Sequence, residues 1–116
     1  GADGSTAAAI LAELQAPESV GAIAELLKQD TVVGRRQLIA ALGKVKSADA
    51  VAALGRELFS DSSGVRAAAA DALALQGDAA KSQLEALDAL KGDYSFVVRQ
   101  AATAAVTKLS ATEAPR

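Results

Sequence analysis

The chain has 116 residues and a net charge of -2, and it contains no cysteine and no histidine. The usual zinc, haem and iron–sulfur ligand sets and the histidine-based catalytic pairs are therefore absent. The charges form no basic stripe for nucleic-acid phosphates, and no apolar stretch approaches the roughly 18 residues that a membrane-spanning helix needs. Abundant alanine and few aromatic residues favour an all-α fold.

We expect seven helices, in chain order at about 5–15, 17–29, 33–45, 48–59, 63–76, 78–91 and 94–110. Ser47, Asp61 and Asp78 are the predicted N-caps, because their side chains can accept a hydrogen bond from an unpaired amide. Gly77 fits a helix end, where a left-handed backbone is favourable.

We expect one domain over residues 6–110, with a cloning remnant or disordered segment at 1–5 and a disordered tail at 111–116. The opening "GADGS" without an initial methionine predicts a domain excised from a larger bacterial protein. The sequence does not indicate a compartment, and the cytoplasm is the default expectation.

The sequence repeats with a period of 31 to 33 residues, which is the spacing of Arg35, Arg66 and Arg99. An apolar residue follows each arginine by seven positions. Two helices and a short turn at this period are typical of an α-solenoid, in which each helix pair packs against its neighbours. The alanines at 67–70 then allow close helix packing, and Leu73 fills the remaining volume. We predict a right-handed α-solenoid of about three and a half repeats.

Two kinds of motif recur in these repeats. A valine–arginine pair stands at Val65-Arg66 and Val98-Arg99, and "ALG" closes a first helix at residues 41–43. With these motifs, residues 20–110 resemble the short HEAT-like repeats that also occur in phycobilin lyases. The resemblance implies a protein-binding scaffold for most members and bilin attachment for some. One member of that family is an iron-dependent hydroxylase that uses histidine–glutamate pairs, and this chain has no histidine to form them.

Aspartates precede the three arginines by five or six residues, and we interpret both sets as a structural ladder. In it, each aspartate accepts hydrogen bonds from turn amides and from an arginine, whose guanidinium fits a carboxylate. Arg66 is expected to bind Asp61 or Asp30. The alternative is an anion site formed by the arginines. The ladder consists of Asp30, Arg35, Asp61, Arg66, Asp93 and Arg99.

The candidate protein-binding surface, called here the second-helix face, lies on the second helix of each repeat. The resemblance implies that these helices line a concave surface. Its mixture of opposite charges favours a basic or mixed-charge protein segment, and an ordinary solvated surface is the alternative. Glu85 and Asp88 are three residues apart on this surface. We expect no pocket that would bury them and tune their pKa values for acid–base chemistry. The second-helix face consists of Glu25, Lys28, Arg56, Glu57, Lys81, Glu85 and Asp88.

Three aromatic residues complete the list of candidates. Phe96 is expected in the core as a hydrophobic staple ahead of the last helix, whereas Tyr94 and Phe59 fit either the core or a recognition surface. An odd number of helices leaves the last one without a partner. We therefore expect exposed apolar surface at Val106 and Leu109, with an end-to-end contact through the C-terminal helix as one way to cover it.

Together these features predict a non-catalytic protein-interaction scaffold that binds a protein partner and no cofactor, metal or nucleic acid, and that does not insert into a membrane. The alternative is an accessory domain that handles a chromophore, similar to a bilin lyase.

Overall fold

The computed structural model describes residues 18–28 and 34–111 of the chain. Within these residues every regular element is helical. The elements are α2 (Glu18–Leu27), α3 (Arg35–Gly43), α4 (Ala48–Glu57), α5 (Ser63–Ala74), the 3₁₀ helix η1 (Gly77–Gln83), α6 (Leu84–Ala89), the 3₁₀ helix η2 (Leu90–Gly92) and α7 (Phe96–Ala111). The helix predicted at 5–15 and the segments predicted as disordered lie outside the described residues, except that Ala111 ends α7.

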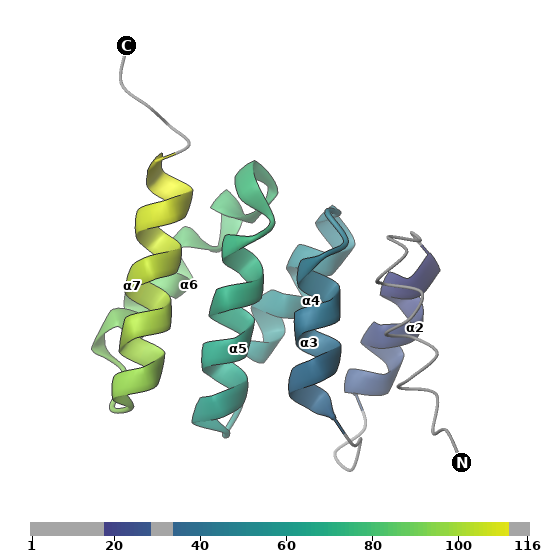
Figure 1. Ribbon diagram of the computed structural model, residues 1–116, viewed down its shortest axis with the longest axis horizontal. Helices are drawn as coiled ribbons and strands as arrows, with labels where there is room; N and C mark the ends of the chain where they lie inside the picture. Colours follow the sequence, from purple (N-terminus) through teal and green to yellow (C-terminus); the bar gives the residue numbers. More distant parts are fainter. Residues whose placement is uncertain (1–17, 29–33, 112–116) are drawn as a thin grey trace.

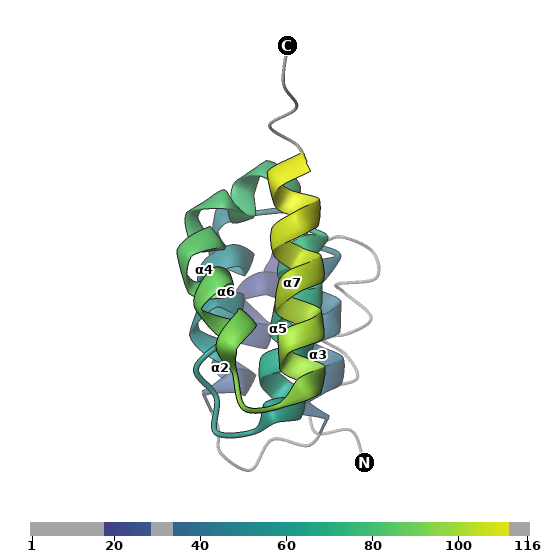
Figure 2. The same cartoon turned by 90° about the vertical axis from the view of Figure 1, so that its left-hand side faces the viewer.

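The helices form an α-solenoid of two layers, as the repeat period predicts. Helices α3, α5 and α7 lie side by side in what we call the first-helix layer, and α2, α4 and the η1–α6 segment form the second-helix layer (Figures 1 and 2). Each helix contacts its neighbours in the same layer and its partner in the other. None of the described helices combines the length and apolar character that crossing a bilayer requires.

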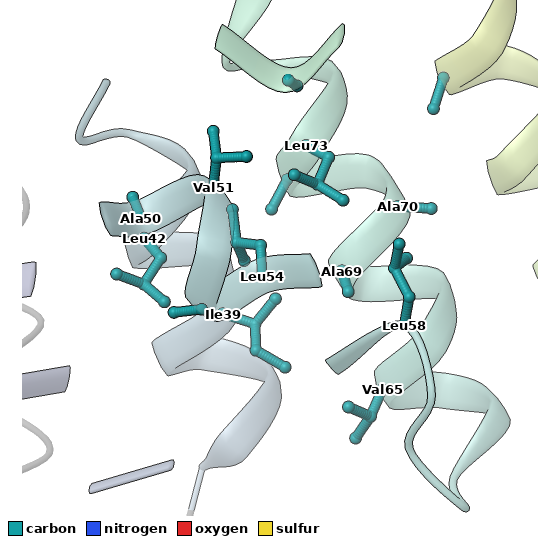
Figure 3. Close-up of a cluster of buried hydrophobic side chains, with 14 of the residues drawn as sticks. Ile39, Leu42, Ala50, Val51, Leu54, Leu58, Val65, Ala69, Ala70 and Leu73 are labelled. Carbon is teal, nitrogen blue, oxygen red and sulfur yellow. The ribbon is translucent and has the colours of Figure 1, made fainter. Parts of the chain in front are cut away.

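Alanine allows the layers to pack closely. Helix α5 buries four alanines together with Leu73, and Leu54 of α4 and Leu58, which follows the end of α4, extend the same core (Figure 3). At the contact between α3 and α5, a Cβ atom added to Gly43 would lie 3.0 Å from the Cβ of Ala72. The small residues therefore set the spacing between neighbouring repeats.

Two of the predicted N-caps are wrong and one is confirmed. Ser47 caps α4, since its Oγ accepts a 3.0 Å hydrogen bond from the amide of Ala50. Ser62, one residue after Asp61, caps α5 instead. Asp78 lies inside the first turn of η1 and caps no helix. Gly77 has the predicted left-handed backbone, with φ of 70°.

The helix predicted at 78–91 is divided into η1, α6 and η2. At the first break, the backbone of Gln83 has φ and ψ of -101° and 4°. The Gln83 side chain lies over Gly55 of α4, where an added Cβ atom would come within 2.7 Å of it. Glycine at position 55 therefore provides the space that this side chain occupies.

The exposed apolar surface at the end of the solenoid differs from the prediction. Leu109 is fully buried and Val106 is partly buried against the core, so neither forms an exposed patch. Val98 takes the inward position at the start of α7, which turns Phe96 and Val97 outward with 61% and 59% of their surfaces exposed. The prediction that Phe96 joins the core is therefore wrong. Tyr94 and Phe59 are also exposed.

Candidate functional site

Arg66 of α5 binds both a carboxylate and a carbonyl oxygen through its guanidinium. Its Nε donates to Oδ1 of Asp93 at 3.0 Å and its Nη2 donates to Oδ2 at 3.2 Å. Its Nη1 donates to the carbonyl oxygen of Ser60 at 2.7 Å. The carboxylate of Asp93 also accepts from the amide of Ser95 at 2.8 Å. One buried guanidinium thus joins the turn before α5 to the turn before α7.

The aspartates of the ladder are not equivalent to one another. Arg99 Nη1 donates to the carbonyl oxygen of Asp93 at 2.8 Å, six residues back, as Arg66 does to Ser60. Asp93 therefore corresponds to Ser60 in the repeat, and Asp61 corresponds to Tyr94. The prediction that Arg66 binds Asp61 or Asp30 is wrong. Asp61 is exposed, and it lies one position later in its turn than Asp93 does in the next repeat. Asp30 lies outside the described residues.

Arg35 makes a different ion pair. Its Nη1 lies 2.9 Å from Oε1 of Glu57, and both side chains are mostly buried. Ser60 occupies, one repeat earlier, the position of Asp93 in the sequence of the repeat. Because serine has no carboxylate, Arg35 has no equivalent there of the Asp93 that pairs with Arg66. Glu57, predicted for the second-helix face, instead ties the end of α4 to the start of α3.

The ion pair of Arg66 and Asp93 changes the acid–base properties of both groups. The hydrogen bond from Arg66, followed by that from the Ser95 amide, lowers the pKa of the Asp93 carboxyl below its usual value. The same bond to Asp93 raises the pKa of Arg66. Arg66 and Asp93 are therefore both charged at neutral pH. Elsewhere on α5, burial raises the pKa of Asp71.

Ion pairs within single helical turns occupy much of the second-helix face. The side chains of Lys28 and Glu25 are 2.9 Å apart and strongly exposed. Lys81 pairs with Asp78 at 3.4 Å, and Asp88 pairs with Lys91 at 3.0 Å. The two residues of each pair are three positions apart in the sequence and at least one side chain of each pair is exposed, so each pair contributes little to stability. The second-helix face thus carries exposed charges of both signs, many of them in ion pairs.

A hollow of about 220 Å³ lies between α2 and α4 on the second-helix face. Its lining combines apolar side chains with three of the predicted binding residues: Ala24, Leu27, Lys28, Ala53, Arg56 and Glu57. The structure therefore brings Lys28, Arg56 and Glu57 together. Glu85 and Asp88 stand on α6, which lies further along the second-helix layer (Figure 2).

The described residues hold no group of three or more acidic side chains placed to bind a metal ion. The buried amide of Gln76 and the outward turn of Phe96 differ from what the sequence predicts. Recognising Ser95 as the N-cap of α7 predicts the second, since Phe96 then starts the helix and Val98 faces the core. Gln76 carries no comparable signal, because an isolated glutamine in an amphipathic segment is usually exposed.

Helix pairs with arginines at equivalent positions, Arg35, Arg66 and Arg99, recur along the described residues. A sequence model of HEAT repeats matches residues 27–107, which is more than half of the chain. The chain belongs to the HEAT-repeat family. The match confirms the predicted HEAT-like solenoid, and the closer resemblance to the phycobilin-lyase type stays a prediction. Comparison with curated proteins gave no match. HEAT repeats commonly serve as scaffolds for protein interactions.

Proposed function

We propose that this HEAT-repeat chain is a non-catalytic scaffold that binds a protein segment along the second-helix face. The observation that carries the proposal is the hollow between α2 and α4, in which Lys28 and Arg56 border an apolar floor that includes Ala24 and Ala53. Protein recognition surfaces combine apolar contacts with a polar rim in this way. A repeat solenoid presents such a surface over several helices in succession.

The charges of this face indicate the kind of partner. Lys28 and Arg56 border the hollow, and Glu85 and Asp88 add negative charge on α6. A segment with acidic groups near α2 and basic groups near α6 matches this order. The proposed partner is therefore a mixed-charge protein segment that lies across several repeats.

The test compares Arg56→Ala with Arg36→Ala, because both arginines are exposed and they stand on opposite layers. Each variant is immobilised, exposed to lysate of the source organism, and the recovered material is identified by mass spectrometry. The unchanged chain and Arg36→Ala should recover the same protein, and Arg56→Ala should recover at least several-fold less. Exposed substitutions usually change stability by no more than about 0.5 kcal/mol, so thermal melting should show both variants folded.

Two results would contradict the proposal. Equal recovery by all three chains would show that the second-helix face is not the binding surface. Recovery of a chromophore without a protein would favour the bilin lyase-like alternative.

A further inference from the structure

Arg99 repeats the position of Arg66 at the C-terminal end of the solenoid. Both donate through Nη1 to the carbonyl oxygen six residues back, at 2.8 Å for Arg99 and 2.7 Å for Arg66. Arg66 also holds the carboxylate of Asp93, which the next repeat supplies. Among the described residues, no carboxylate takes that place at Arg99. The guanidinium edge that binds Asp93 in one repeat is therefore available in the next.

A depression of about 530 Å³ adjoins this guanidinium on the outer side of α7, which we call the C-terminal face. The lining residues are Lys91, Phe96, Arg99, Gln100, Thr103 and Ala104. The face lies at the end of the first-helix layer, and no described helix covers it (Figure 1). The Arg99 guanidinium, whose carbon lies 5.7 Å from the centre of the Phe96 ring, thus stands beside apolar surface from Phe96 and Ala104.

The interface one repeat earlier shows what such a site accepts. The turn that carries Asp93 to Arg66 also places the Tyr94 ring 5.3 Å from the Arg66 guanidinium carbon. Ser95 follows as the N-cap of α7, with its Oγ accepting from the amide of Val98 at 3.5 Å. An aspartate, an aromatic residue and a capping serine in sequence therefore satisfy an arginine of this kind.

The side chains of α7 on the C-terminal face differ from those with which α5 contacts α7. Gln100 and Thr103 stand where α5 presents Ala67 and Ala70, which are buried against the neighbouring helix. The longer polar side chains do not allow another helix to pack along the whole of α7 as closely as α7 packs on α5. The part of the interface that remains intact is the arginine with the apolar surface beside it.

We propose that the C-terminal face binds a partner segment that begins a helix with an aspartate–aromatic–serine turn. The partner's carboxylate accepts two hydrogen bonds from Arg99, and its apolar side chains pack on Phe96 and Ala104. A second folded copy of this chain does not supply the segment, because its own Asp93 is already held by Arg66. The partner is therefore a different helical segment with this turn.

The probe is a synthetic peptide with the sequence DYSFVVRQAATAAVTK, which reproduces residues 93–108. Titration into the isotope-labelled chain should shift the nuclear magnetic resonance signals of Phe96, the Arg99 side chain and Ala104. A peptide with asparagine in place of its aspartate should bind about tenfold more weakly or worse, because the charged hydrogen bonds are lost.

Three variants of the chain locate the contact. Ala104→Glu should weaken binding by about tenfold or more, because it places a charge on the apolar surface against which the peptide packs, whereas Ala104→Leu, which keeps that surface apolar, should retain binding. Ala52→Glu, the same change at an exposed alanine of α4, should leave binding unchanged.

The proposal is overturned if the peptide causes no shifts at millimolar concentration, or if both peptides bind equally. It is also overturned if the shifts fall on α5, which would mean that the peptide replaces α7, or on the second-helix face. Because the two surfaces have separate resonances, failure here does not bear on the proposed scaffold function.

Discussion

Arg66 and Asp93 are 27 residues apart in the sequence, and they meet in two parallel hydrogen bonds of 3.0 and 3.2 Å with less than a tenth of either side chain exposed. A third bond from the same guanidinium holds the carbonyl oxygen of Ser60. Bidentate arginine–carboxylate pairs combine strength with a fixed orientation. This pair therefore sets the position of the turn before α7 relative to α5.

Replacing Arg66 with alanine should lower the melting temperature by several degrees. The change removes two of the donors to the Asp93 carboxylate, which keeps only the Ser95 amide, and the side-chain donor to the Ser60 carbonyl oxygen, and such groups are costly to leave without partners. Arg66→Lys should also melt early, because an ammonium group does not reproduce the two parallel bonds. Thermal unfolding followed by circular dichroism measures both effects.

Arg56→Ala is the matched control, because Arg56 is exposed on the second-helix face. It should melt within about a degree or two of the parent chain, as surface substitutions usually do. The opposite order, with Arg66→Ala stable and Arg56→Ala unfolding early, would mean that the structural and binding roles of these arginines are reversed.

Much of this arrangement can be predicted from the sequence, but the pairing cannot. The repeat period locates Arg35, Arg66 and Arg99, because buried positions recur wherever equivalent helices pack. The partner of Arg66 depends on the turn, where Asp61 stands five residues before its arginine and Asp93 stands six. A shift of one residue there moves the carboxylate to a different side of the chain. The helical periodicity of the sequence does not predict such a shift, because it lies in a turn.

The same reason explains the error at the end of the solenoid. The apolar residues of α7 outnumber the positions that face the core, so composition alone does not decide which of them are exposed. Because Ser95 fixes where α7 starts, Val98 and Leu109 point inward and Phe96 points outward. The exposure of most charged residues of the second-helix face is easier to predict, since exposed charges at helical spacing need no knowledge of the turns.

The stability of the chain should depend on the protonation of Asp93. Its pKa is lowered in the folded state by the hydrogen bonds from Arg66 and from the Ser95 amide. A lowered carboxyl pKa contributes stability above the unfolded value of 3.8, and this contribution is lost as the pH falls through the lower folded value. The free energy of unfolding should therefore decrease from about pH 5 downward, and Asp93→Asn should weaken that dependence.

Asp61→Asn tests whether the effect belongs to Asp93 alone. It removes the same charge from an exposed position one repeat earlier. Urea unfolding of the three chains at pH 6, 5, 4 and 3 should give parallel curves for the parent and Asp61→Asn, and a flatter curve for Asp93→Asn. A flatter curve for both variants would indicate a general effect of net charge.

Gln76 should be the most sensitive polar side chain outside the ladder. Its buried Nε2 donates to the carbonyl oxygens of Leu42 and Val45 at 3.1 and 2.9 Å, and its Oε1 accepts from the amide of Ser47 at 3.2 Å. Gln76→Leu keeps the size of the side chain but removes these three hydrogen bonds to the backbone around the turn after α3. We expect a loss of about 2 kcal/mol or more in urea unfolding.

Gln100→Leu makes the same change on the exposed face of α7. It should alter the free energy of unfolding by no more than about 0.5 kcal/mol. Equal losses in the two variants would show that the bonds of Gln76 to the turn after α3 do not stabilise the fold.

Gly43 and Gly21 should respond in opposite directions to the same substitution. Gly43 ends α3 against α5, where an added Cβ atom would lie 3.0 Å from the Cβ and 3.1 Å from the Cα of Ala72. Overpacking of this kind costs about 1–3 kcal/mol, which exceeds the gain of about 1 kcal/mol in helix propensity. At Gly21 of α2, no atom of the described residues lies within 4 Å of the added Cβ atom, so only the gain remains. Urea unfolding should show Gly43→Ala destabilised and Gly21→Ala stabilised, and stabilisation of both would mean that α3 and α5 can separate without cost.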